Sequence, residues 1–175
     1  GGRIRKVIKN GVLTICYAGL KETIYILSGK DALKEDDLKL ALSILKFMKD
    51  KCESYENENK LNFSLRETYE DEVLKYFASV DKSLYGTIKN VTNKYEYSKF
   101  YEIFKEIDIG FTNRLKFENK LKKYSNGGYF ELINIPKNTS YKKFIDILKE
   151  VYENDVHFIK VEVDKREWIL EDLIN

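Results

Sequence analysis

The residues YFELINIPKNTSYKKFIDILKEVYENDVHFIKVEV, numbers 129–163, carry the clearest structural pattern in the chain. Two runs rich in β-branched and aromatic residues, 129–135 and 156–163, flank a segment, 140–153, whose apolar side chains recur at the spacing of one helix face. Two strands joined by a helix of this length favour a parallel pair with a right-handed crossover. A capping pattern directly after this stretch indicates one more helix. The stretch therefore predicts a β-α-β-α unit.

The first thirty residues predict a small antiparallel sheet, because apolar and β-branched residues cluster there between glycines. Strands are expected at 3–9 and 12–17, joined by Asn10-Gly11, a dipeptide typical of tight hairpin turns. A third strand is expected at 22–27. Three short strands in direct succession are too close in sequence to be parallel neighbours, so we expect an antiparallel β-meander.

The middle of the chain predicts helices. Over residues 35–48 the apolar side chains follow helical spacing, and acidic residues occupy the first turn. Ser64 followed by Glu67 matches the capping-box pattern at the start of a second helix. The same signature precedes a predicted helix at 93–107, and a less regular helix is expected at 112–124.

Together these patterns predict an α+β protein with an N-terminal antiparallel β-meander, a helical middle and a C-terminal β-α-β-α unit. The length of the chain suits a single domain, 1–175. The polar segment 53–62 lacks periodicity and is a candidate linker, so a division into 1–55 and 63–175 is an alternative. The glycine turn at 125–128 is another candidate boundary. The chain opens with two glycines rather than methionine, which suggests a fragment of a longer protein.

The composition predicts a folded, soluble protein. Hydrophobic residues make up 43% and charged residues 34% of the chain, unlike disordered sequences. The longest nearly uncharged apolar stretch, 12–20, is about half of the ~20 residues that a membrane helix needs, and no export signal is recognisable. Cys16 and Cys52 lack metal-site spacing and are expected to be free thiols. We therefore expect a cytoplasmic protein without membrane contact.

The familiar cofactor motifs are incomplete in this sequence. A phosphate-binding loop at 28–30 would need a glycine where Ile24 stands and a hydroxyl side chain where Asp31 stands. The glycine pair 127–128 lacks the third glycine of a dinucleotide fingerprint. No cofactor is expected.

Metal and catalytic sites are also weakly indicated. His157 is the only histidine, and zinc sites need several histidine or cysteine ligands. A Ser-His-Asp arrangement with His157 is compatible with the sequence, but no nucleophile motif accompanies it. Lys160, Glu162 and Asp164 alternate along one strand face, which fits a solvated face better than a magnesium site. We expect no catalytic and no metal-binding residues.

Charge is distributed unevenly along the chain. The net charge of +2 conceals a basic region, 110–143, in which Glu118 and Glu131 are the only acidic residues. The candidate anion- or nucleic-acid-binding residues are Arg114, Lys116, Lys120, Lys122, Lys123, Lys142 and Lys143. Such a cluster suits contact with a phosphate backbone. Lysines on outer helix faces also keep proteins soluble, so both interpretations stay open.

The leading functional hypothesis is a non-catalytic protein-interaction or regulatory domain. It follows from the lack of a complete catalytic set and from an aromatic content of 14%, which leaves aromatic side chains for a protein partner or for self-association. One alternative is a nucleic-acid-binding domain that uses the basic stretch 114–143. The other is an enzyme without a recognisable motif, which a pocket with converging titratable groups would favour.

Overall fold

The computed structural model describes residues 2–128, 131–154 and 159–163. The chain forms two compact units, each considered by itself. Unit 1 comprises residues 1–109 and 120–129, and unit 2 comprises residues 110–119 and 130–175. One helix, α5, contributes its first part to unit 2 and its last part to unit 1.

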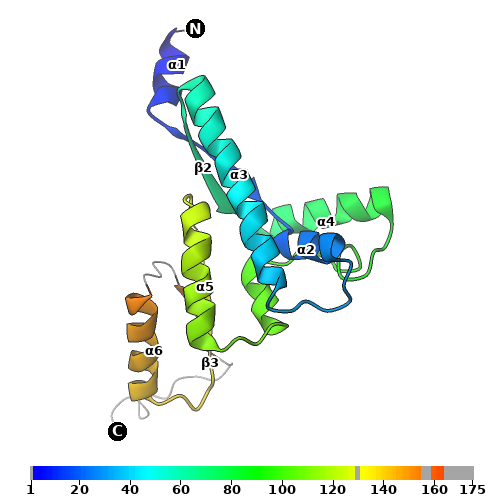
Figure 1. The fold of residues 1–175 in the computed structure, drawn as a ribbon, viewed down its shortest axis with the longest axis vertical. Coiled ribbons are helices and arrows are strands. Elements are labelled where there is room, and N and C mark those ends of the chain that lie inside the picture. The colour runs from blue at the N-terminus through cyan, green and yellow to red at the C-terminus, as the bar shows by residue number, and fades with distance from the viewer. Residues whose placement is uncertain (1, 129–130, 155–158, 164–175) are drawn as a thin grey trace. The chain divides into compact units, whose positions relative to one another are not determined.

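The elements follow one another along the chain as Figure 1 shows. Unit 1 contains α1 (Gly2–Lys9), β1 (Val12–Tyr17), α2 (Leu20–Ser28), α3 (Asp37–Asn59), β2 (Asn62–Glu67), α4 (Asp71–Tyr85) and the short 3-10 helix η1 (Phe100–Lys105). After α5 (Phe111–Tyr124), unit 2 contains β3 (Glu131–Ile135), α6 (Tyr141–Glu153) and β4 (Ile159–Val163).

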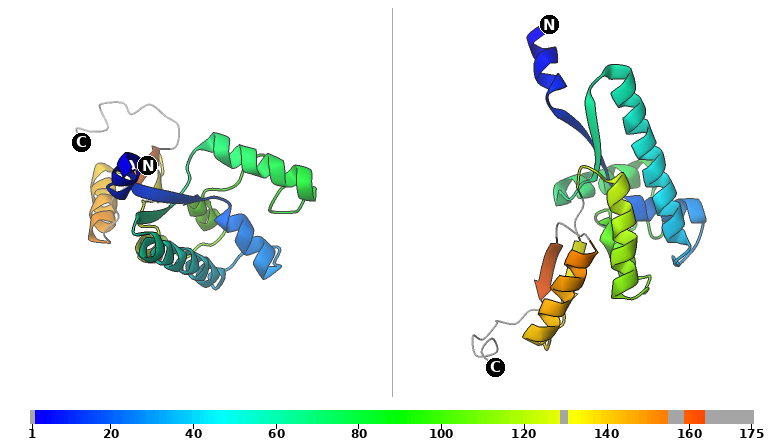
Figure 2. Two further views of the ribbon diagram at one scale, coloured as in Figure 1. Left: turned by 90° about the horizontal axis from the view of Figure 1, so that it is seen from above. Right: turned by 60° about the vertical axis from the view of Figure 1, so that its left-hand side comes forward.

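A parallel strand pair, β1 with β2, organises unit 1. The register places Val12 opposite Asn62 and Tyr17 opposite Glu67. The connection between the strands runs through α2 and α3, and α3 lies alongside β2 and contacts it (Figures 1 and 2). The other side of Leu65 is also paired: its amide donates to Asn126 Oδ1 at 3.0 Å, and its carbonyl accepts from the amide of Gly127 at 2.8 Å. The turn at 125–128 therefore closes the open edge of β2.

The core of unit 1 lies between this strand pair and the helices. Its fully buried apolar side chains come from α2, α3, β2, α4 and η1. They include Ile24, Leu45, Leu65, Leu74 and Ile103. Because each of these elements contributes to the core, the loop that carries η1 is held against the strand pair.

The predicted N-terminal β-meander is wrong. Residues 3–9 belong to helix α1 and residues 22–27 to helix α2. In α2 the buried side chains Leu20, Ile24 and Tyr25 follow helical spacing, and Gly29 ends the helix in the left-handed conformation. The strand β1 has no hairpin partner at Asn10-Gly11; its partner β2 lies far along the chain. The short runs of β-branched residues resemble strands in the sequence. In the structure, the apolar side chains of α2 are instead buried along one helix face.

Two boundaries in the middle of the chain also differ from the prediction. Helix α3 continues through most of the predicted linker 53–62, up to Asn59, and Lys60 then adopts a left-handed conformation. Ser64 and Glu67 do not cap a helix, since both lie in β2. The helix predicted at 93–107 is reduced to η1, because residues 94–99 form an irregular loop.

Unit 2 matches its prediction more closely. Strands β3 and β4 pair in parallel, with Ile133 opposite Val161, and α6 connects them. The hydroxyl of Ser140 accepts a hydrogen bond from the amide of Lys143 and caps α6. Leu115 and Val151 complete a small apolar core. The helix predicted after residue 163 lies outside the described residues.

The predicted α+β class with an antiparallel meander is therefore wrong as a whole. The regular structure is mostly helical, and both strand pairs within the described residues are parallel. In the part of the chain that the structure describes, no helix is long and apolar enough to cross a membrane.

Candidate functional site: buried carboxylates and a lysine-lined groove

The start of α2 buries two charged side chains. Gly19 has a φ of 69°, and a Cβ at this position would lie 3.3 Å from the ring of Tyr97. This close approach is open only to glycine, and it directs the first turn of α2 into the core. Lys21 and Glu22 are 4% and 2% exposed. Charges so deeply buried need partners, and both have them.

Lys21 pairs with Glu106, just after η1. The Lys21 ammonium lies 2.5 Å from Glu106 Oε1, and the hydroxyl of Tyr25 donates to the other carboxylate oxygen. Burial alone would raise the pKa of Glu106, but the hydrogen bonds from Lys21 and Tyr25 outweigh burial and lower it. Burial and the bond to Glu106 raise the pKa of the Tyr25 hydroxyl. Glu106 is thus held ionised by residues of α2.

Glu22 fixes the loop in front of η1. Its Oε1 accepts a hydrogen bond from the amide of Ser98 at 3.0 Å, and the Lys94 ammonium lies 3.6 Å from the same oxygen. Lys94 also donates to the hydroxyl of Ser98 at 3.1 Å. The second oxygen, Glu22 Oε2, is buried and has no hydrogen-bond partner among the described residues. One carboxylate therefore positions both the backbone and a lysine of the loop.

A second buried carboxyl of this network, Glu67, stands at the end of β2. The amide of Phe100, at the start of η1, donates to Glu67 Oε1 at 2.5 Å. Burial raises the pKa of Glu67 to about 8, although the hydrogen bonds from Phe100 and Tyr69 and the charge of Lys99 partly oppose burial. The Glu67 carboxyl can therefore exchange a proton near neutral pH.

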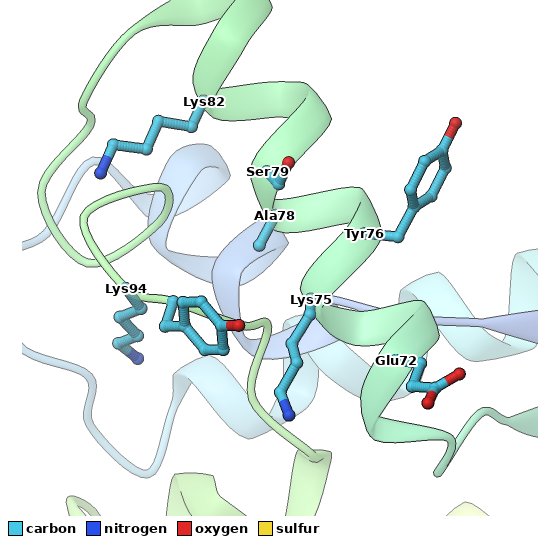
Figure 3. Close-up of a pocket in the computed structure, with 8 residues that line it drawn as sticks. Glu72, Lys75, Tyr76, Ala78, Ser79, Lys82 and Lys94 are labelled. Carbon is cyan, nitrogen blue, oxygen red and sulfur yellow. The ribbon is translucent and has the colours of Figure 1, made fainter.

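A groove lies beside this network, between α4 and the loop 94–98. Its volume is about 380 Å³ (Figure 3). The residues that line it are Glu72, Lys75, Tyr76, Ala78, Ser79, Lys82, Lys94 and Tyr95. Figure 3 shows Lys82 and Lys94 ending on one side of α4, whereas Tyr76 and Glu72 leave the helix on the other. Lys94 links the groove to the buried Glu22.

The described residues offer little for metal binding. No group of three or more histidine, cysteine, aspartate or glutamate side chains converges within 2–128, 131–154 and 159–163. Both cysteines are free: Cys52 is buried, and the exposed Cys16 accepts a hydrogen bond from Arg66 at 3.4 Å. The predicted free thiols are confirmed, and His157 lies outside the described residues. What the network does provide is positioning, proton exchange at Glu67 and positive charge in the groove.

The comparison with protein families decides the assignment. A family model described as anaerobic ribonucleoside-triphosphate reductase matches residues 1–165 of this chain. The chain belongs to the anaerobic ribonucleoside-triphosphate reductase family.

Individual reductases are similar but much longer. The anaerobic ribonucleoside-triphosphate reductases of Haemophilus influenzae and Escherichia coli are 27% and 25% identical to this chain over 142 residues. These matches cover 77% of this chain and 20% of each relative, so the chain spans about a fifth of the length of these curated relatives.

Solved reductases share the fold. A structure of an anaerobic ribonucleotide reductase superposes with a TM-score of 0.73 at 18% identity, covering 90% of this chain and 25% of that one. The Thermotoga maritima anaerobic ribonucleotide reductase with dATP in its specificity site gives a TM-score of 0.71 at 18% identity, with 89% and 26% covered. At this level of identity the structures support the fold alone.

Membership of the reductase family corrects the functional prediction. The leading hypothesis, a non-catalytic protein-interaction domain, is wrong because the family consists of enzymes. The alternative of an enzyme without a recognisable motif agrees better with the reductase family. No motif recognised in the sequence had pointed to this family, whose match extends over residues 1–165.

The predicted basic stretch is spread over two helices in this reductase-family chain. Lys116, Lys120 and Lys123 are exposed and follow one another along one face of α5. Arg114 is instead paired with the buried Glu118, at 3.1 Å. Lys122 is half-buried in α5, and Lys142 and Lys143 are exposed in the first turn of α6. Whether this surface binds anions stays a prediction.

The residues of the carboxylate network were missed in the sequence. Both Glu22 and Glu67 have polar neighbours in the sequence, so no local pattern marks either side chain as buried. Lys75 and Lys82 share a helix face, but their relation to Lys94 depends on the path of the loop. Only the fold brings the groove together.

Proposed function

We propose that the polypeptide carrying this chain reduces ribonucleoside triphosphates to 2′-deoxyribonucleoside triphosphates without oxygen. Replacing the 2′-hydroxyl by hydrogen takes up two electrons and releases water, so a reductant has to take part. The family match over residues 1–165 carries the proposal. The fold shared with solved anaerobic ribonucleotide reductases supports it.

In this proposal the chain supplies a rigid part of the enzyme rather than the reacting groups. Two buried carboxyls, Glu22 and Glu67, and the partly exposed Glu106 tie the segment 94–106 to α2 and β2. Such multiple contacts hold a loop within the small tolerance that an active site needs. Glu22, Glu67 and Glu106 are therefore positioning residues.

The exposed apolar side chains of α4 support a further part of the proposal, a protein partner. Val73, Tyr76, Phe77 and Tyr85 are all exposed, and Tyr76 is 65% accessible. Several exposed apolar side chains on one helix are often covered by protein. We propose that the rest of the longer polypeptide, or a second copy, covers it, and that the enzyme works in the cytoplasm, where ribonucleotides are found.

The test uses the polypeptide in its own cell extract. An antibody against this chain is used to deplete an anaerobic extract, and conversion of labelled CTP to dCTP is followed; CTP is bound by the Thermotoga maritima reductase in a solved structure. Depletion should remove most of the anaerobic activity, and the purified polypeptide should restore it. Unchanged CTP reduction after complete depletion would contradict the proposal.

A further inference from the structure

Helix α6 of unit 2 carries two stripes of apolar side chains. One stripe packs into the core cluster of this unit and consists of Phe144, Ile147 and Val151. The other, here called the outer stripe, follows helical spacing on the neighbouring face and consists of Tyr141, Ile145, Leu148 and Tyr152. Tyr141 and Tyr152 are 59% and 84% exposed. One buried stripe is enough to hold a helix on a strand pair, so the outer stripe is available for another contact.

The first part of α5 does not cover the outer stripe, because it contacts the opposite side of α6. The hydroxyl of Thr112 donates to the carboxylate of Glu150, and the side-chain amide of Asn119 donates to the carbonyl of Asn154 at 2.7 Å. At 100° per residue, Glu150 points away from the outer stripe. Ile145 and Leu148, in the middle of the stripe, are only half-buried.

Two lysines border the outer stripe. Lys142 and Lys149 lie two turns apart on one side of it, and both are exposed. Within residues 2–128, 131–154 and 159–163, neither ammonium group has a hydrogen-bond or ion-pair partner. Antiparallel pairing of α6 with a second copy would bring Lys142 beside Lys149 of that copy, where like charges repel. The outer stripe therefore suits an acidic partner better than a second α6.

The last residues of this chain have the composition that such a face selects. Four acidic residues outnumber two basic ones between 164 and 175. The apolar residues Ile169, Leu170, Leu173 and Ile174 recur at the spacing of one helix face. Glu167 and Glu171 are one turn apart beside this face. The segment 164–175 thus combines an apolar face with an acidic border, the complement of the outer stripe and its two lysines.

The path of the chain also leads towards the outer stripe. Strands β3 and β4 are parallel; α6 follows β3, and residue 164 directly follows β4. Both connections therefore start from the same end of the strand pair. Successive right-handed crossovers place their helices side by side on one face of a sheet. A helix of twelve residues is about 18 Å long, and the outer stripe, 141–152, spans the same number of residues as 164–175.

We propose that residues 164–175 pack as a helix on the outer stripe of α6, with acidic side chains facing Lys142 and Lys149. The contact covers the apolar face of unit 2 from within the same chain. The family match ends at residue 165, so neither the reductase family nor ribonucleotide reduction requires this contact.

Hydrogen exchange, followed by mass spectrometry of peptides that cover residues 166–175, measures the docking. In the unaltered protein, exchange should be at least about tenfold slower than in a synthetic peptide of residues 164–175. Tyr152→Ser removes one end of the outer stripe and should raise the exchange rate by about fivefold. The matched control is Tyr85→Ser, the same change at an exposed tyrosine of unit 1, which should leave the rate within about twofold.

A charge reversal tests the acidic border of the segment. Lys149→Glu should raise the exchange rate of residues 166–175 at low ionic strength and have less effect at high ionic strength, because salt screens exposed charges. Glu171→Lys in the same protein should restore slow exchange. Lys143→Glu is the matched control, since Lys143 lies on the side of α6 away from the outer stripe.

Three results would overturn the inference. These are exchange of residues 166–175 as fast in the unaltered protein as in the peptide, slow exchange that Tyr152→Ser and Lys149→Glu leave unchanged, and slow exchange that requires a high protein concentration, which would indicate a second copy. Exchange of β3 in the same data checks that unit 2 is intact. Since no turnover is measured, each of these results leaves the proposed reductase function standing.

Discussion

Both units contain a parallel strand pair joined by a helical crossover, but the side chains buried around the two pairs differ. In unit 2 a single helix, α6, joins β3 to β4, and the core cluster is apolar: Leu115, Ile133, Ile135 and Val151. The buried carboxyl of Glu118 is also in unit 2, where it pairs with Arg114 one turn away on α5. In unit 1 the crossover consists of two helices, α2 and α3. Lys21 and Glu22 of α2 and Glu67 of β2 are buried beside the apolar core. Buried charge costs stability unless it is paired, so proteins keep it where it has a role. We infer that the buried charges of unit 1 hold separate elements together, whereas the Arg114–Glu118 pair of unit 2 lies within one helix.

The largest expected effect is the loss of Glu22. Glu22→Ala leaves the Lys94 ammonium and the Ser98 amide without their buried acceptor, and breaking a buried charge pair of this kind costs about 3–5 kcal/mol. Urea unfolding of the two proteins measures the difference. The control in unit 2 is Ile135→Ala, which loses apolar packing alone and should cost about 2–5 kcal/mol. A loss below about 1 kcal/mol for Glu22→Ala would show that the network does not hold unit 1.

Glu67 should make the stability of unit 1 depend on pH. Its pKa is raised from 4.5 in the unfolded chain to about 8 in the folded one. The folded state therefore holds a proton that the unfolded state releases, and the free energy of unfolding falls as pH rises from about 4.5 to about 8. A shift of this size is worth up to about 5 kcal/mol.

Glu67→Gln tests this pH dependence. The amide can still accept from Phe100 but does not ionise, so the fall in stability between pH 5 and 8 should largely disappear. Unfolding midpoints measured across this range give the answer. If the unaltered protein and the variant show the same pH profile, Glu67 does not titrate as described.

Gly19→Ala should have an intermediate effect. A non-glycine residue at a φ of 69° is strained, and its Cβ would press on the Tyr97 ring at 3.3 Å. We expect a loss of about 1–3 kcal/mol. Gly29→Ala serves as the matched control, because its φ is also positive but nothing lies within 4 Å. A larger loss at Gly29 than at Gly19 would contradict the close packing of α2 against the loop.

The smallest effect is expected in unit 2. Ser140→Ala removes the side-chain cap of α6 and should lower stability by about 1 kcal/mol, as is usual for such caps. Thermal unfolding followed by circular dichroism measures it. Ser140→Asn, which restores a capping oxygen, should recover most of the loss; no recovery would mean that Ser140 acts in another way.

The two units also differ in how much of them the sequence revealed. Unit 2 was predicted well because its strands and helix are contiguous and each ends at a local signal, such as Ser140. Unit 1 was misread because β1 pairs with β2 far along the chain, and no local pattern reports that partner. Ser64 and Glu67 match a capping box by spacing, yet tertiary pairing made them part of a strand.

The candidate site was largely hidden for the same reason. Lys75 and Lys82 sit on a helix that was predicted, although its start was placed too early. Their relation to Lys94, Glu22 and Glu67 exists only after α2, β2 and the loop have come together. The basic residues of α5 and α6 could be recognised in the sequence, because counting charges along the chain does not require knowledge of the fold. The positions of charged residues can be read from the sequence, but their contacts cannot.

Amide hydrogen exchange at Ser98 and Phe100 tests the central claim most directly. Both amides lie in or beside an irregular loop, yet each donates to a buried carboxylate, Glu22 or Glu67. We predict strong protection of both amides, with Ser98 selectively losing it in the Glu22→Ala protein, which has no side-chain acceptor. Exchange as fast as in an exposed loop in the unaltered protein would contradict the claim that buried carboxylates of unit 1 hold this loop in place.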